Sequence, residues 1–203
     1  MKNENFLTVL KSNVRINHKH TLIPSILLLL VIPLIYGTAN LDCVKSADCL
    51  ERMTALIGIP MFTPLLYREQ SEDLYSIVAL RPFPLRAVAA LRIGISAVGA
   101  LGLILIFEVS MAVRGSTFPV GAYAFRTLAA CMVLGFTGLL CASAMKNVVA
   151  GYLGAFVFCF AVQARGGGSL FRAVTNGIQP PLLLFLFGAA AAILFAVGRP
   201  GGR

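Results

Sequence analysis

Long apolar runs follow one another through this chain, with short polar stretches between them. The first run extends from Leu22 to Tyr36, and others recur as far as Gly198. A helix of about 20 apolar residues crosses the roughly 30 Å hydrocarbon core of a bilayer. Inside lipid every backbone N–H and C=O group must be bonded within the protein, so spanning segments are helices or closed barrels. The runs predict an all-α, polytopic membrane protein.

The composition agrees with this class. The chain of 203 residues is 58% hydrophobic and 12% charged, with a mean hydropathy of +0.86, whereas soluble domains are about 45–50% apolar. Its net charge of +9 does not indicate nucleic-acid binding, because Lys and Arg are scattered between the apolar runs. Orientation in a bilayer explains the basic residues better, so lipid is the expected surrounding and nucleic acid is not an expected partner.

Six membrane-spanning helices are expected. Their ranges are Leu22–Tyr36, Met53–Tyr67, Ile93–Val113, Thr127–Met145, Val148–Ala164 and Pro180 to about Gly198. The second span is short and is interrupted by Pro60 and Pro64. Residues 40–52 and 114–126 are expected to be polar loops, and Lys146-Asn147 a tight turn.

Residues 1–20 are polar and basic with an amphipathic pattern, which predicts an interfacial helix before the first span. A cleaved signal peptide is the alternative for this region, because a basic segment and an apolar run precede the small residues Gly37 and Ala39. The long basic region and the later spans favour the interfacial helix.

The distribution of basic residues predicts the orientation, because Lys and Arg favour the cytoplasmic side of a membrane. With six spans and the N-terminus inside, eleven of them lie in the cytoplasm and six outside. The count favours a multi-pass protein of the cell membrane with both termini in the cytoplasm. Residues 68–92 then lie in the cytoplasm.

Residues 68–92 include the most charged stretch of the chain. Ser71 is placed to cap a short helix, Glu72 and Asp73 put negative charge at its N-terminus, and Arg81 puts positive charge at its C-terminus. Pro82 then ends it. A charged helix with one apolar stripe, held at a membrane surface, is suited to docking a partner. The stripe consists of Leu74, Ile77 and Val78.

Glu108 lies inside the third apolar run. An acid within a membrane span is a candidate functional residue, here on a translocation path. The alternative is that Glu108, near the end of the span, reaches the interface.

Two further features concern packing and covalent structure. Cys43 and Cys49 are close together in a loop expected to face outside, so they are candidates for a disulfide, with two free thiols as the alternative. A small-residue face suited to helix contact in lipid comprises Gly188, Ala192 and Ala196. No metal site is expected, because the two histidines, His18 and His20, both lie in the N-terminal segment.

Over nearly its whole length the chain resembles the permease subunit of ABC-2 type transporters. In that family the loop after the second span begins with a Glu, continues with an acidic helix and ends in a Pro-containing element with basic residues. Glu69, Glu72-Asp73-Leu74 and residues 81–86 occupy those places here. Residues 169–179 also resemble the family's external segment before span six. The short second span departs from the usual length.

The resemblance implies a single transmembrane domain over residues 1–203 that works as a dimer, with a second copy or a paralogue. It also implies a separate ATPase subunit docked on the loop, and ATP and Mg²⁺ would belong to that subunit. The sequence has no G-x-x-x-x-G-K-[ST] motif, so this chain is not expected to be an enzyme. An amphiphilic substrate such as a peptide, lipid-linked molecule or drug is expected. The coupling residues would be Glu69, Ser71, Glu72, Asp73, Leu74, Ile77, Val78 and Arg81.

Other classes of function compete with this interpretation. An ion-coupled secondary transporter would use Glu108 as its coupling carboxylate, although ion relays normally need several ionisable groups in the membrane. A membrane enzyme would need a metal cluster or catalytic dyad, and the apolar runs supply neither. A non-transporting scaffold or immunity protein also remains open.

Overall fold

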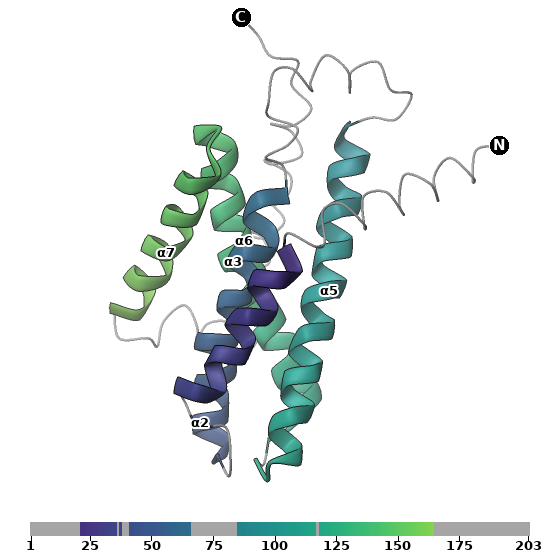
Figure 1. Ribbon diagram of the computed structural model, residues 1–203, viewed down its shortest axis with the longest axis vertical. Coiled ribbons are helices and arrows are strands. Elements are labelled where there is room, and N and C mark those ends of the chain that lie inside the picture. The colour runs from purple at the N-terminus through teal and green to yellow at the C-terminus, as the bar shows by residue number, and fades with distance from the viewer. Residues whose placement is uncertain (1–20, 36, 38–40, 66–84, 117, 165–203) are drawn as a thin grey trace, which may run out of the picture.

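A computed structural model describes residues 21–35, 37, 41–65, 85–116 and 118–164 (Figure 1). Within these ranges the regular elements are all helical, which confirms the predicted all-α class. Ala89–Val113 and Val120–Met145 are long and apolar enough to cross a membrane, and Thr21–Ile35 and Val148–Val162 are shorter apolar helices. The expected interfacial helix 1–20, the docking helix 71–81 and the sixth span lie outside the described residues.

Consecutive helices run in opposite directions (Figure 1). The helix Thr21–Ile35 descends, the helical run 43–65 ascends, and α5 (Leu85–Val113), α6 (Val120–Met145) and α7 (Val148–Ala164) follow in turn. At what we call the lower end, Leu41 N donates to Ser116 Oγ at 3.3 Å. At the upper end, Arg92 Nη1 donates to the Leu65 carbonyl at 3.3 Å. These bonds join connections that are far apart in the sequence.

The second helical region differs from the prediction. A loop over 40–52 and a span over Met53–Tyr67 were expected, whereas the chain is helical from Cys43 to residue 65. This central run comprises α2 (Cys43–Asp48), a π-helical segment (Cys49–Met53), a 3-10 segment (Thr54–Ile57), α3 (Gly58–Phe62) and a 3-10 turn at 63–65. At 1.5 Å per residue an α-helix of this length would extend roughly 34 Å.

Pro60 accounts for part of this irregularity. It has no N–H for the carbonyl four residues earlier, that of Leu56, and its ring crowds the same group. The chain is tightened to a 3-10 helix before it, where the Gly58 N–H donates to the Ala55 carbonyl. Upstream, the Thr54 N–H donates to the Cys49 carbonyl five residues back, which is the π-helical bond.

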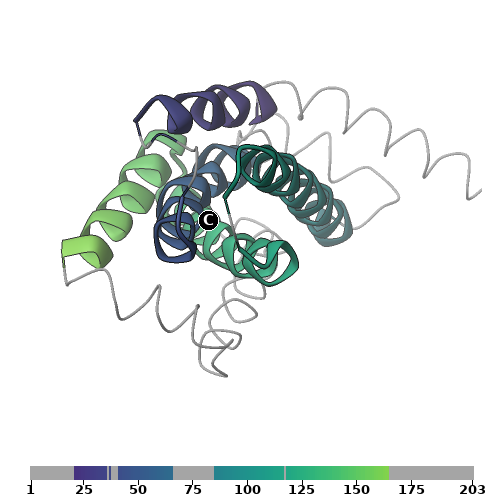
Figure 2. The same cartoon turned by 90° about the horizontal axis from the view of Figure 1, so that it is seen from below.

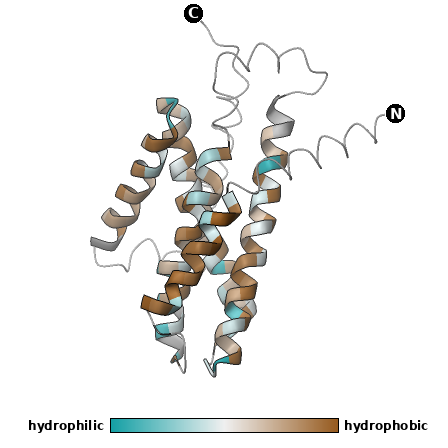
Figure 3. Cartoon of the chain, in the orientation of Figure 1, coloured by the Kyte–Doolittle hydropathy of each residue, from teal (hydrophilic) through white to brown (hydrophobic). Residues whose placement is uncertain are grey.

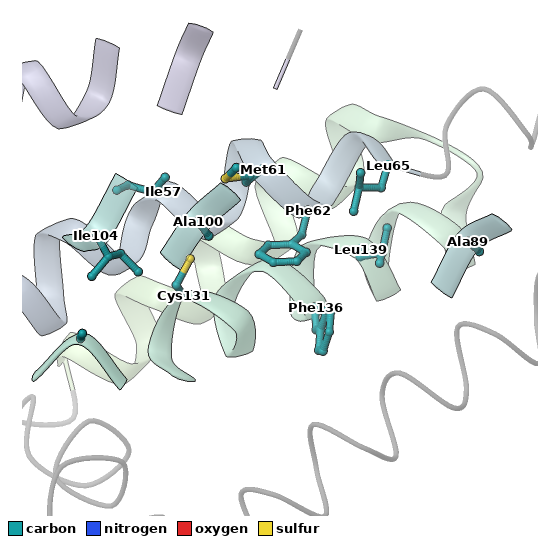
Figure 4. Close-up of a cluster of buried hydrophobic side chains, with 11 residues drawn as sticks. Ile57, Met61, Phe62, Leu65, Ala89, Ala100, Ile104, Cys131, Phe136 and Leu139 are labelled. Carbon is teal, nitrogen blue, oxygen red and sulfur yellow. The ribbon is translucent and has the colours of Figure 1, made fainter. Parts of the chain in front are cut away.

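The central run is surrounded by the other described helices. Seen from below, the blue run lies between the purple helix Thr21–Ile35 and α6, with α5 and α7 beside it (Figure 2). Its largest buried side chain, Phe62, meets Phe136 of α6 edge to face with ring centroids 5.5 Å apart (Figure 4). The core cluster around this pair is Ile57, Met61, Phe62, Leu65, Ala89, Ala100, Ile104, Ala124, Cys131, Phe136 and Leu139.

Glycines bring the backbones of the central run and α6 into contact. A Cβ on Gly58 would overlap the carbonyl oxygen of Cys131, and one on Gly135 would lie 2.8 Å from the carbonyl oxygen of Gly58. On the next interface, a Cβ on Gly151 of α7 would lie 2.7 Å from the Gly138 carbonyl oxygen. Close packing of this kind holds helices together where the surroundings are as apolar as the side chains.

The ends of α5, α6 and α7 follow from local chemistry. Gly115 takes φ +86°, and the Gly115 and Ser116 N–H groups donate to Ala112 and Met111 carbonyls, a Schellman motif that ends α5 at Val113. The Val149 N–H donates to Asn147 Oδ1 at 2.9 Å and so caps α7. The predicted turn and the fifth span Val148–Ala164 are confirmed as a turn and a helix.

The fourth helix begins earlier than expected. The sequence predicts a loop to Arg126 and a span from Thr127, whereas α6 starts at Val120, directly after Pro119. Arg126 is only half-buried and its guanidinium carbon lies 5.8 Å from the centre of the Tyr123 ring. The helix can therefore include this charge without burying it alone.

Apolar side chains also cover much of the outer surface. Leu34 is 85% exposed, Val113 82% and Phe160 67%. Figure 3 shows brown, apolar residues over most of the helix surfaces and teal, polar residues mainly toward their ends. Such an extended apolar surface is uncommon on soluble monomers.

We expect Gly58→Ala to destabilise the fold, because its Cβ would displace the α6 backbone. Overpacking of this kind costs about 1–3 kcal/mol or more. The matched control is Gly102→Ala in α5, where nothing lies within 4 Å of the added Cβ and better helix propensity contributes up to about 1 kcal/mol. Thermal unfolding in detergent, followed by circular dichroism, measures both. Equal melting temperatures for the two variants would contradict the close contact.

Candidate functional site

Two buried carboxyl groups lie toward the lower end of the bundle. Glu108 is on α5, one and a half turns before its end at Val113, and its side chain is 0% exposed. Neither of its oxygens has a hydrogen-bond partner among the described residues. The side chain therefore faces the interior of the bundle rather than its outer surface.

Glu51 is the second buried acid, and it lies in the π-helical segment at the lower end. Its residue is 7% exposed, and its Oε1 atom has no partner within the described part of the chain. Burial raises the pKa of the Glu51 carboxyl from 4.5 to about 7. The Arg126 guanidinium acts against this by lowering the pKa, Asp48 raises it and Arg52 lowers it.

The basic residues near Glu51 are already engaged. Arg52 Nε lies 3.3 Å from Asp48 Oδ1, one turn earlier on the same helical run. Arg126 lies over the Tyr123 ring, which packs edge to face on Phe118 with centroids 5.9 Å apart. The lower end thus holds charged residues of the central run and α6, and the aromatic rings of Tyr123 and Phe118 lie beside them.

The disulfide predicted between Cys43 and Cys49 is not formed. Cys49 is a free thiol that is 0% exposed, and burial raises its pKa to about 11. Cys49 lies six positions after Cys43 on one helical run, so their Cα atoms are about 9 Å apart along the axis. A disulfide needs Cα atoms within roughly 7 Å. The expected loop would have allowed this approach, and the observed helix prevents it.

Several predicted site residues fall outside the described residues. These are the coupling residues Glu69, Ser71, Glu72, Asp73, Leu74, Ile77, Val78 and Arg81, and the small-residue face Gly188, Ala192 and Ala196.

The structure brings together residues that sequence reasoning missed, above all Glu51 and Arg126. The i,i+4 spacing of Asp48 and Arg52 was a signal for a helix through Glu51.

Comparison with family models, curated proteins and solved structures finds no match to this chain. Within the described ranges, no group of three or more His, Cys, Asp or Glu side chains could hold a metal ion. What the site offers chemically is two carboxyl groups in apolar surroundings, one of them facing an arginine. Such groups bind and release protons or pair with cations.

We expect Glu51→Gln to remove a pH-dependent loss of stability. The folded chain keeps the Glu51 proton up to a pKa of about 7 and the unfolded chain loses it near 4.5, so wild-type stability falls as pH rises between these values. The loss reaches up to about 3 kcal/mol. Unfolding midpoints in detergent across this pH range test it. The variant should be the more stable protein above pH 7, and exposed Asp42→Asn should keep the wild-type profile; parallel profiles for all three would refute the assignment.

Proposed function

We propose that this chain is the membrane-spanning permease subunit of an ATP-driven ABC-2 type transporter. One observation carries the proposal: the described residues that flank the charged segment 66–84, Leu65 and the start of α5, lie at the same end of the bundle. Leu65 and Arg92, on either side of it, are joined by a hydrogen bond at the upper end. A capped acidic helix that emerges there between two apolar helices stands where a docked ATPase can act on both.

The surface of α5 supports the membrane part of this proposal. In the most apolar 18-residue stretch of α5 only 22% is buried inside the molecule, against 56% in that of α6. The core helix of a soluble protein is mostly buried, whereas Val98 and Ile106 of α5 are 71% and 68% exposed. Lipid, or a second permease copy, is the surrounding that suits this face.

We infer six spans with the upper end in the cytoplasm. Residues 41–42 and 114–116 lie at the lower end of the alternating helices, and Leu65, the start of α5 and Lys146 lie at the upper end. The segment 66–84 and its flanks carry Arg68, Arg81, Arg86 and Arg92, which favours that end for the cytoplasm. ATP-driven movement of the helix 71–81 would then rock the central run against α5, and an amphiphilic molecule would be exported along a path that includes Glu108.

A second candidate, an ion-coupled secondary transporter, is favoured by one observation. Glu108 is completely buried without a partner among the described residues, as a coupling carboxylate would be. In that case transport would need an ion gradient and no ATPase.

Reversal of Glu72 and Asp73 to Lys is the test of the coupling helix. Positive charge at a helix N-terminus opposes its dipole by about 0.3–1 kcal/mol per residue, and it repels basic groups on a partner. We expect normal protein level, weakened association with the ATPase and lost transport. Co-purification with a Walker-type ATPase encoded by a neighbouring reading frame, and ATP hydrolysis in reconstituted vesicles, measure the effect.

The matched control for this experiment is Asp42→Lys, an exposed charge reversal at the lower end. It should leave association and ATP hydrolysis unchanged. Should the double variant behave as wild type while Asp42→Lys does harm, the docking helix would be an ordinary solvated loop. Transport that persists without ATP but follows an ion gradient would favour the second candidate.

Orientation is tested by labelling single cysteines in a chain whose five native cysteines are replaced by alanine. A membrane-impermeant maleimide applied outside should reach Lys45→Cys, which is exposed at the lower end. It should miss Ser71→Cys and Lys146→Cys, which a permeant maleimide reaches. Labelling of Ser71→Cys from outside would reverse the orientation and remove the docking argument.

A further inference from the structure

The position of Glu108 sets it apart from the other acids of the described chain. It shares the inner face of α5 with Ile104 and Met111, both 0% exposed, while the next residue, Val109, is 53% exposed. The carboxyl group therefore points away from the surroundings of the bundle and into its packed interior.

Among the described residues, no charged group compensates Glu108. The described charges at the lower end are Asp42, Lys45, Asp48, Glu51 and Arg52 on or just before the central run, Arg126 on α6, and Arg114 just beyond α5; the helix Thr21–Ile35 carries none. Asp48 pairs with Arg52, and Arg126 acts on Glu51.

An ionised carboxylate in such a place is expensive. Removal of a charge from water costs several kcal/mol unless a partner or hydrogen bonds compensate it, and neither oxygen of Glu108 has either within the described ranges. The neutral carboxylic acid avoids this cost. We propose that Glu108 is a proton-binding site, which holds a proton while the bundle is packed and releases it when α5 separates from its neighbours.

A proton suits this site better than a metal ion does. Ca²⁺ and Mg²⁺ take six or more oxygen ligands and Zn²⁺ takes about four from His, Cys and acidic side chains, and the described residues offer no cluster of acidic, His or Cys side chains for one. The nearby Ser110 hydroxyl is outside this site, because it is exposed and donates to the Phe107 carbonyl at 2.7 Å. A proton needs no ligand shell.

Release of the proton is tied to opening of the bundle. The O–H bond of the carboxylic acid breaks, its electron pair stays on the carboxylate, and the proton passes to water at the lower end. Rebinding restores the neutral acid and permits α5 to pack again. Opening thus becomes easier as pH rises, by up to about tenfold per pH unit for one proton. The site goes beyond the proposed function, because it needs neither the ATPase nor a substrate.

Infrared spectroscopy of the full chain in lipid nanodiscs tests the protonation directly. At about pH 6 exposed acids are ionised, so the carboxylic acid C=O stretching band reports buried neutral groups. Glu51 contributes to this band, and we expect Glu108→Gln to remove a further component from the wild-type band. The matched control Glu51→Gln should keep this component. The proposal would be overturned if Glu108→Gln removed no part of the wild-type carboxylic acid band.

Opening is measured by alkylation of Cys131, which is 0% exposed on α6 and packs in the same core as Ala100 of α5. Mass spectrometry gives its rate in wild type relative to Glu108→Gln at each pH, so the intrinsic pH dependence of the thiol cancels. We expect the ratio to rise with pH by up to about tenfold per unit. A ratio that does not change with pH, or one that depends on sodium at fixed pH, would overturn proton binding. If Glu108→Gln does not fold, the infrared spectrum of Glu51→Gln decides. A carboxylic acid band in that variant supports proton binding by Glu108, and the absence of the band refutes it.

Discussion

Contact between the backbones of the central run and α6 is the interaction on which the rest of the described structure depends. Gly58 lies against the Cys131 carbonyl, and Gly135 lies against Gly58 and Phe62. Without side chains at these places the short helix α3 sits deep enough for α5, α6 and α7 to pack around it. The edge-to-face pair Phe62 and Phe136 then fills the space beside the glycines.

The C-terminal ends of α5 and α6 and the bounds of α7 were predictable from the sequence, whereas the start of α6 and the central run were not. The turn at Lys146-Asn147 separates two apolar runs, so the end of α6 and the whole of α7 followed from hydropathy and capping. The central run did not, because two prolines and several charges make it a poor helix by local criteria. It is helical because neighbouring helices bury most of its length from Cys49 to Leu65, and local sequence preferences do not contain that information.

The candidate site was predictable in part. Glu108 stands out in the sequence because an acid interrupts an apolar run, but its burial depends on which face of α5 meets the bundle. Glu51 appeared as one charge among several in a polar stretch. Its environment arises from tertiary contact with α6, and a distance of 75 residues along the chain separates it from Arg126. Contacts between residues so far apart in the chain cannot be predicted from sequence spacing, which indicates only pairs three or four residues apart on one helix.

The π-helical segment Cys49–Met53 has a geometrical consequence for everything that precedes it. A π-turn contains about one residue more than an α-turn, and each residue turns a helix by about 100°. Relative to a continuous α-helix, α2 is therefore rotated by about that angle around the axis. Deletion of one residue from this segment would return the register to that of an ordinary helix, turning α2 with Asp48 toward a different side relative to Arg52. The side of the central run on which its charges lie is thus set by an insertion one residue long.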